Sequence, residues 1–133
     1  MEIKVTINEM IELFQDKEFR DSFLGEWIAF TLRSQIKAMR LRKGWTQAVL
    51  ARKMETGTSV VSRLENMTPK TMPSILTLRK IARIFDVALM VRFSEWSSLL
   101  KEVEAYIENG YKIPIPNEFK DDVLFGDNAE TRK

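Results

Sequence analysis

Apolar residues alternate with polar ones at the start of the chain, where Ile3, Val5 and Ile7 occupy every second position. A period of two is typical of a strand with one buried face, so the pattern predicts a short strand over residues 2–7. Asn8 follows as a candidate N-cap, which predicts that a helix begins directly after the strand.

Further along, apolar residues recur at intervals of three and four, the spacing of one buried helix face. A basic turn followed by Gly44 is a usual helix end, and Thr46 and Ser74 are usual N-caps. Gly25 is the one place where the pattern allows a break in the longest helix. The predicted helices cover residues 10–14, 17–42, 46–54, 58–66, 74–85 and 96–107.

Residues 87–93, Val-Ala-Leu-Met-Val-Arg-Phe, are apolar and β-rich, and they predict a second short strand. An isolated strand leaves its backbone N–H and C=O groups unpaired, so this one needs a partner. The partner can be residues 2–7 of the same chain, the same strand of a second copy, or both.

Charge is distributed unevenly along the 133 residues. The net charge is only +2, but residues 33–83 hold 12 basic and 2 acidic side chains, a net of +10. The segments before and after carry −4 each. A positive centre between acidic flanks is the footprint of a module that binds a polyanion, although a solvated basic helix face gives the same pattern.

The chain contains no cysteine and no histidine. It therefore lacks disulfides, thiolate metal sites, the commonest general base and the commonest metal ligand. The acidic residues of the C-terminal part lie on a solvated helix or in the tail without a nitrogen ligand: Glu102, Glu104, Glu108, Asp121 and Asp122. We predict no enzyme, no cofactor and no metal site.

The first ten residues show no signal-peptide pattern, and no apolar run approaches the roughly 18 residues of a membrane span. We therefore predict a soluble, cytoplasmic protein that has no contact with a membrane.

Two short predicted helices, separated by about three residues, form the unit that reads the major groove of DNA. In such a unit the second helix exposes its first turn to base edges and buries its other face. Burial of Val61 and Leu64 would turn outward the small or basic residues of that helix: Thr58, Ser59, Ser62 and Arg63.

The stretch from Arg40 to Val87 resembles the helix-turn-helix domain of the lambda Cro/repressor (Xre) family, and the resemblance covers roughly residues 33–87. It rests on Gly44-Trp45-Thr46-Gln47, Leu50-Ala51, Val61-Ser62-Arg63-Leu64-Glu65-Asn66, Leu78, Ile81-Ala82 and Val87. The resemblance implies a four- to five-helix DNA-binding domain.

The resemblance also implies roles for single residues. Thr58 and Ser59 fall at base-reading positions, and Gln47 falls where the family holds a phosphate. Arg40 and Glu65 match a pair that forms a structural salt bridge. The predicted DNA-binding residues are Gln47, Thr58, Ser59, Ser62, Arg63, Asn66 and Lys70.

Three positions near the turn bear on its geometry. Glu55 stands where the family usually has a glycine with a left-handed backbone, and Gly57 offers the turn another path. Met67 replaces a second family glycine, which follows the third helix of the family pattern.

The predicted fold is mainly α: a lambda-repressor-like DNA-binding domain with a small two-stranded or intersubunit β-sheet. Residues 1–32 are predicted to form an N-terminal strand and helical extension, and residues 33–87 the helix-turn-helix domain. Residues 88–133 are predicted to form a C-terminal strand, helix and tail, which serve as a dimerisation or partner surface.

The predicted function is sequence-specific binding of double-stranded DNA as a transcriptional repressor. One recognition helix reads few base pairs, so we expect a homodimer, with the strand over 87–93 and the helix over 96–107 at or near its interface. One alternative is an antitoxin that binds a protein toxin and represses its own operon, since the acidic flanks would suit a basic toxin. Another is a protein-interaction module that has lost DNA binding, which the +10 centre disfavours.

Overall fold

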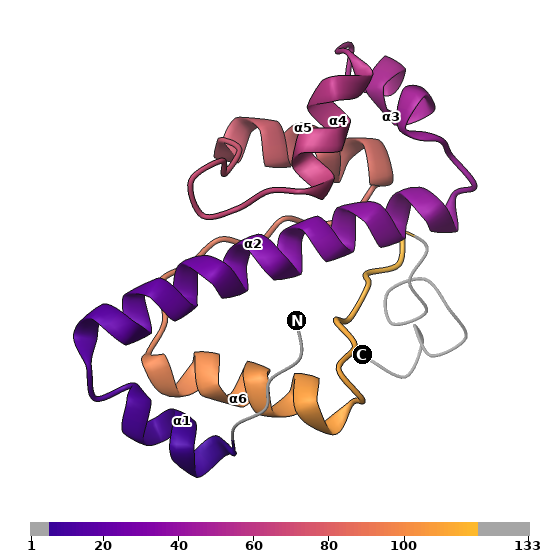
Figure 1. Ribbon diagram of the computed structural model, residues 1–133. Coiled ribbons are helices and arrows are strands. Elements are labelled where there is room, and N and C mark those ends of the chain that lie inside the picture. Colours follow the sequence, from indigo (N-terminus) through magenta and orange to yellow (C-terminus); the bar gives the residue numbers. More distant parts are fainter. Residues whose placement is uncertain (1–5, 120–133) are drawn as a thin grey trace, which may run out of the picture.

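The computed structural model describes residues 6–119, and within them the chain forms six helices and no strand. The helices are α1 (Ile7–Leu13), α2 (Lys17–Arg42), α3 (Gln47–Lys53), α4 (Thr58–Glu65), α5 (Ile75–Phe85) and α6 (Trp96–Glu108) (Figure 1). The prediction of a mainly α fold is confirmed. The bounds of α2 are those that the sequence pattern predicts, and Gly25 does not interrupt it. None of these six helices is long and apolar enough to cross a membrane.

The first helix begins earlier than the sequence pattern predicts. The Thr6 hydroxyl accepts a hydrogen bond from the Glu9 N–H at 3.1 Å, and the Glu9 carboxylate accepts one from the Thr6 N–H at 3.3 Å. This capping box satisfies two amide groups at once, so the cap is Thr6 and the prediction of Asn8 is wrong. Ile7 belongs to α1, and residues 2–5 of the predicted strand lie outside the described residues.

The second predicted strand is also absent from the described chain. Residues 87–95 run without helix, turn or bend between α5 and α6, and they form no ladder with another described segment. The apolar, β-branched composition is that of a strand, but a strand exists only when its backbone groups pair with a neighbour. No described segment of this chain supplies that neighbour.

The longest helix, α2, is buried on two faces. Figure 1 shows α3, α4 and α5 on one side of α2, and α1 and α6 on the other. Ala29, Ile36 and Met39 of α2 enter the first layer, whereas Trp27 enters the second. Because α2 packs against other helices on two sides, its apolar residues are not confined to one face.

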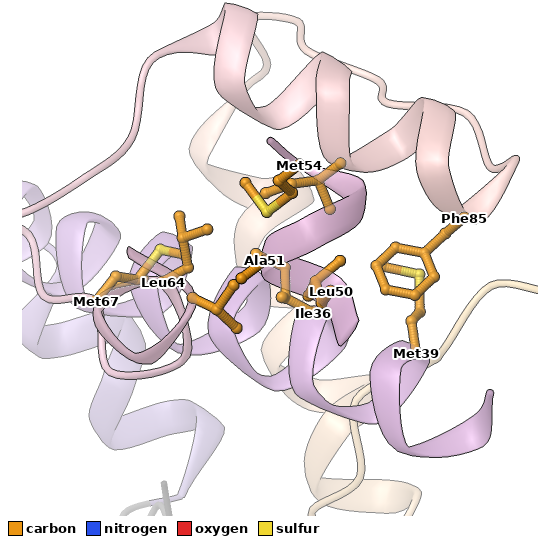
Figure 2. Close-up of a cluster of buried hydrophobic side chains, with 11 residues drawn as sticks. Ile36, Met39, Leu50, Ala51, Met54, Leu64, Met67 and Phe85 are labelled. Atoms are coloured by element: carbon orange, nitrogen blue, oxygen red, sulfur yellow. The ribbon is translucent and has the colours of Figure 1, made fainter. Parts of the chain in front are cut away.

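The first hydrophobic core joins α2 to α3, α4 and α5 (Figure 2). Its side chains are mostly aliphatic or methionine, and Leu50, Val61 and Met67 have no exposed surface. The buried members are Ala29, Ile36, Met39, Leu50, Ala51, Met54, Val61, Leu64, Met67, Ile81 and Phe85.

The second hydrophobic core joins α2 to α1 and α6, and it is rich in aromatic rings. The ring centroids of Trp27 and Tyr106 lie 5.4 Å apart with an edge-to-face orientation. The ring of Phe14 meets that of Phe23 in the same way, also at 5.4 Å. The buried members are Met10, Phe14, Trp27, Leu99, Val103 and Tyr106.

After α6 the chain returns along α2 as a C-terminal strap, residues 111–119. The side chains of Gln35 and Arg42 donate hydrogen bonds to strap carbonyl groups at 2.9 and 2.8 Å. The Lys43 ammonium pairs with the Glu118 carboxylate at 2.6 Å. The two isoleucines of the strap pack one against each hydrophobic core, so the strap ties the two layers together.

Candidate nucleic-acid interface

The turn between α3 and α4 passes through one left-handed residue. Glu55 has a φ of 58°, in a region that side-chain-bearing residues rarely adopt. Gly57 has an ordinary φ of −85° and is the N-cap of α4. The expectation that Gly57 gives the turn another path is therefore wrong. The chain keeps a left-handed backbone at Glu55, where the family pattern has glycine.

Helix α4 divides into a buried face and an exposed face. Val61 is fully buried and Leu64 nearly so, which fixes the helix on the first hydrophobic core. Thr58, Ser59 and Arg63 are exposed, as the spacing predicts, and Ser62 is half-buried at the border between the two faces. No side chain caps the start of α4, so its first turn presents small hydroxyl side chains and free amide groups to the outside.

A buried ion pair fixes α4 against α2. The guanidinium of Arg40 donates to both carboxylate oxygens of Glu65, with N···O distances of 2.6 and 2.9 Å. It also donates to the Trp45 carbonyl at 2.8 Å, just before α3. Hydrogen bonding to Glu65 holds the pKa of the Arg40 guanidinium above its ordinary value. The predicted structural salt bridge is confirmed, and it joins three consecutive elements at one point.

Gln47 reaches the same carboxylate from the start of α3. Its Nε2 donates to Glu65 Oε1 at 3.3 Å, and its side chain is half-buried. Thr46 caps this helix, because its hydroxyl accepts from the Val49 N–H at 3.2 Å. Gln47 is therefore held by the carboxylate that also binds Arg40, at the first residue of α3.

Asn66 and Lys70 lie after α4 and are both exposed. The Asn66 side chain donates to the Ser62 carbonyl at 2.8 Å, which closes the last turn of α4. The loop that follows is ordered by its own hydroxyl groups. The Thr68 hydroxyl accepts from the Lys70 N–H at 3.3 Å, and the Thr71 hydroxyl accepts from the Thr68 N–H at 2.9 Å. These bonds hold the backbone of Lys70 and leave its ammonium group exposed.

Two contacts of this loop with α2 escaped the sequence analysis. Arg33 donates to the Met67 carbonyl at 3.2 Å, while its guanidinium lies 5.4 Å from the centroid of the Phe30 ring. Gly25 of α2 lies against the side chain of Pro69, and a Cβ atom at this position would make an ordinary van der Waals contact with Pro69 at 3.4 Å. No sequence pattern announces either contact, because the partners are more than 30 residues apart.

Met67 is fully buried in the first hydrophobic core. The residue that replaces a family glycine thus fills a space between α4 and α2. The site therefore consists of the exposed start of α4. The position of this helix is fixed by the ion pair between Arg40 and Glu65 and by close packing in the first hydrophobic core.

No group of three or more potential metal-ligating side chains occurs within residues 6–119. The chemistry available on this face is that of hydroxyl, amide and cationic groups, which suits the edges of bases and the oxygens of phosphates.

One protein family has a model that matches the chain: the family described as helix-turn-helix matches residues 36–90. These bounds run from the buried Ile36 of α2, through α3, α4 and α5, to the start of the segment that precedes α6. Neither a curated protein nor a solved structure matches the chain.

Proposed function

We propose, from the premise that residues 36–90 are a helix-turn-helix domain of the Cro/repressor type that binds DNA, that the chain is a sequence-specific transcriptional repressor. The observation that carries the proposal is the exposed first turn of α4, with Thr58 and Ser59, above the buried pair of Arg40 and Glu65. A reading helix must hold its side chains within a fraction of an ångström, and this pair restricts the position of α4.

The charge of the domain supports binding to duplex DNA. Residues 33–83 carry a net charge of +10, and each cation that neutralises a phosphate releases a condensed counterion. Affinity should therefore fall steeply as salt rises. The same excess of positive charge argues against the alternative that this fold serves only to bind another protein.

The roles that we propose follow from position and chemistry. Thr58, Ser59 and Ser62 allow close approach of α4 to the groove, and Arg63 reaches a guanine with two parallel hydrogen bonds. The phosphate backbone is held by the polar groups at the border of the site: Gln47, Asn66 and Lys70.

Gln47 has a further part in this proposal. In the protein without DNA its amide already donates to Glu65, so its side chain is oriented before DNA arrives. An amide that is held in place loses little conformational entropy when it meets a phosphate.

We further propose that the chain works as a homodimer. Helix α4 has only eight residues, so one copy of it can contact only a few base pairs. Two copies related by a two-fold axis would read two half-sites about one helical turn apart, and this is the usual way for such domains to reach useful specificity.

A second candidate function is that of an antitoxin, which would bind a protein toxin and repress its own operon. The observation that favours it is the layer of α1 and α6, which has its own aromatic core and lies outside the family match. The outer residues of α6 include three exposed carboxylates, Glu102, Glu104 and Glu108, which would suit a basic partner.

The experiment that tests the main proposal is selection of random duplex DNA on the purified chain, followed by binding of the selected sequence at two salt concentrations. A two-fold symmetric site, and affinity that falls steeply with salt, are the expected results. If no DNA sequence is enriched and no salt-dependent binding is seen, DNA binding is contradicted. The function that remains is then that of a protein-interaction module. A protein partner that displaces the selected DNA would support the antitoxin.

Two substitutions separate the proposed roles on the selected site. Arg63→Ala should reduce discrimination at one base position by roughly 1–3 kcal/mol. Lys70→Ala should weaken binding to all DNA sequences about equally. It should also lower the slope of log affinity against log salt concentration by about one. If both variants lose only thermal stability and keep their affinity, the assignment of these residues is wrong.

A further inference from the structure

Two cations at the end of α2 are held by the C-terminal strap. The Lys43 ammonium lies 2.6 Å from the Glu118 carboxylate. The Arg42 guanidinium donates to the Pro116 carbonyl at 2.8 Å and to the side-chain oxygen of Asn117 at 3.3 Å. Both cations are exposed and belong to the strongly basic central segment, to which we attribute the affinity for DNA. The strap therefore covers part of the positive charge of this segment.

The covered cations lie beside the proposed DNA contacts. Lys43 precedes Gln47 by four residues, which span at most about 13 Å. The chain turns directly after Lys43, because the Gly44 N–H donates to the Leu41 carbonyl at 2.9 Å. The end of α2 and the start of α3 therefore adjoin. A cation at position 43 is within reach of the DNA strand whose phosphate we assign to Gln47.

The strap and the proposed DNA contacts lie on different sides of the end of α2. Figure 1 shows the strap on one side of this helix and α3 on the other. A lysine ammonium sits on a long, flexible stem and can turn to either side. It cannot reach both sides at once, so the carboxylate of Glu118 and a DNA phosphate exclude each other as partners of Lys43.

We propose that Lys43 and Arg42 are further phosphate-binding residues of the DNA interface, and that the strap competes with DNA for them. The inference rests on the proposed function, because it assigns a regulation to the same site. In the free protein, Glu118 and the oxygens of Pro116 and Asn117 take the place of phosphates. When DNA binds, the end of the strap is displaced and the two cations turn to the DNA backbone.

The contacts within the strap are weak enough for DNA to replace them. The pair of Lys43 and Glu118 lies in solvent, and such an exposed pair shifts an equilibrium by at most about fivefold. The acceptors that hold Arg42 are neutral oxygens. A phosphate is charged and can accept two parallel hydrogen bonds from one guanidinium, so it is the stronger partner.

Only the end of the strap has to move. Ile113 packs against the second hydrophobic core and Ile115 against the first, which anchors this part of the strap. Gln35 of α2 also holds the Pro114 carbonyl at 2.9 Å. Neither core includes one of the described residues from 116 to 119. Displacement of these last residues therefore leaves both cores intact.

The first test is the affinity of the full chain for its selected DNA and for an unrelated duplex. Glu118→Gln should raise affinity about threefold, because Lys43 no longer has to leave a carboxylate. The gain should be the same for both duplexes, since a phosphate contact carries no sequence information. Loss of the fold cannot produce such a gain, because it would lower affinity.

Glu104→Gln is the matched control. It removes the same charge from an exposed position on α6, which lies across α2 from the helix-turn-helix (Figure 1). At about 0.1 M salt, charges more than about 10 Å apart are largely screened, so this variant should leave affinity unchanged. Equal gains in both variants would mean that only net charge matters, and would overturn the proposal.

The second test is a double-mutant cycle. Lys43→Gln should lower affinity about threefold, because one phosphate contact is lost. In that background Glu118→Gln should have no effect, since no cation remains at position 43 for which strap and DNA compete. If Glu118→Gln raises affinity equally in both backgrounds, the carboxylate merely repels DNA, and the proposed competition is wrong.

The third test follows the strap itself and uses the absence of cysteine from the chain. A nitroxide spin label on the single-cysteine variant Asn117→Cys should become more mobile when the protein is saturated with DNA. The same label on Glu104→Cys should not change. Unchanged mobility at position 117 would contradict displacement of the strap.

Failure of the competition and failure of the proposed function give different results. If the original chain binds its selected DNA and Glu118→Gln shows no gain, the competition is overturned and the proposed function stands. If neither the original chain nor Glu118→Gln binds DNA, the proposed function is overturned together with the competition.

Discussion

The two sides of α2 are packed in different ways. The side that carries the helix-turn-helix is aliphatic and contains a buried ion pair between Arg40 and Glu65. The other side, with α1 and α6, consists of stacked and edge-to-face rings around Trp27 and Tyr106. Apolar burial is not directional, whereas a bidentate ion pair fixes the distance and the orientation of the two helices that it joins. Directional contacts therefore occur on the side where α4 must be placed accurately.

This comparison leads to predictions about stability and DNA reading that differ between the two sides. The largest effect is expected in the aromatic core. Trp27→Ala should lower the free energy of unfolding by about 3–5 kcal/mol, because it removes a buried ring that contacts the rings of Phe23, Phe30 and Tyr106. Urea unfolding measures this loss.

Under conditions in which the Trp27→Ala variant is folded, its discrimination between the selected DNA and a single mismatch should be unchanged. Trp27→Phe is the control, and it should lose less stability because most of the ring volume remains. Loss of discrimination in the folded Trp27→Ala variant would mean that the two sides of α2 are not separate in function.

For the buried ion pair of Arg40 and Glu65 we expect the opposite result: stability can be restored, whereas DNA discrimination cannot. Glu65→Ala leaves the Arg40 guanidinium buried without its anion and should cost about 3 kcal/mol. The double variant Arg40→Met with Glu65→Leu should recover most of that stability, since apolar residues of similar size replace such pairs at little cost. The double variant should nevertheless discriminate less well than the original chain between the selected DNA and a single mismatch. The reason is that Gln47 would have lost the carboxylate that orients it. A double variant that reads DNA as well as the original chain would refute a positioning role for the pair.

The left-handed turn offers a smaller and stabilising effect. Glu55→Gly should raise the free energy of unfolding by about 1 kcal/mol, because glycine adopts a φ of 58° without strain. Gly57→Ser is the control. It keeps a favourable N-cap residue at an ordinary φ, and its Cβ would meet no atom closer than 3.8 Å, so a change of only a few tenths of a kcal/mol is expected. Thermal unfolding of the two variants decides whether the strain lies at Glu55.

Local sequence signals predicted the helices well and the segments between them poorly. The bounds of α2 and the caps Thr46 and Ser74 follow from residues next to one another in the chain, and all are confirmed. Residues 87–95 have strand-like composition, but composition does not supply a partner strand.

For the candidate site too, local features were predicted from the sequence and long-range contacts were not. Exposure of Thr58 and Ser59 follows from helical periodicity, and the Arg40–Glu65 pair was expected from the family resemblance. The contacts of Arg33 and Gly25 with the loop after α4 were not, since each joins residues more than 30 positions apart. The C-terminal strap was interpreted only as a tail, because its hydrogen bonds go from side chains of α2 to backbone carbonyls that any sequence has.

The smallest effect concerns the second ion pair, which has the same 2.6 Å separation as the first but lies in solvent. The side chains of Lys43 and Glu118 are 34% and 49% exposed, so water and salt screen their attraction. Glu118→Gln should therefore change the free energy of unfolding by less than about 1 kcal/mol, and 1 M salt should abolish the difference. The loss in Glu65→Ala should persist at that salt concentration, because ions do not reach a buried pair. Urea unfolding of both variants at low and high salt makes the comparison. If the Glu118 variant lost as much stability as the Glu65 variant, the strap, and not only the buried pair, would hold the end of α2 in place.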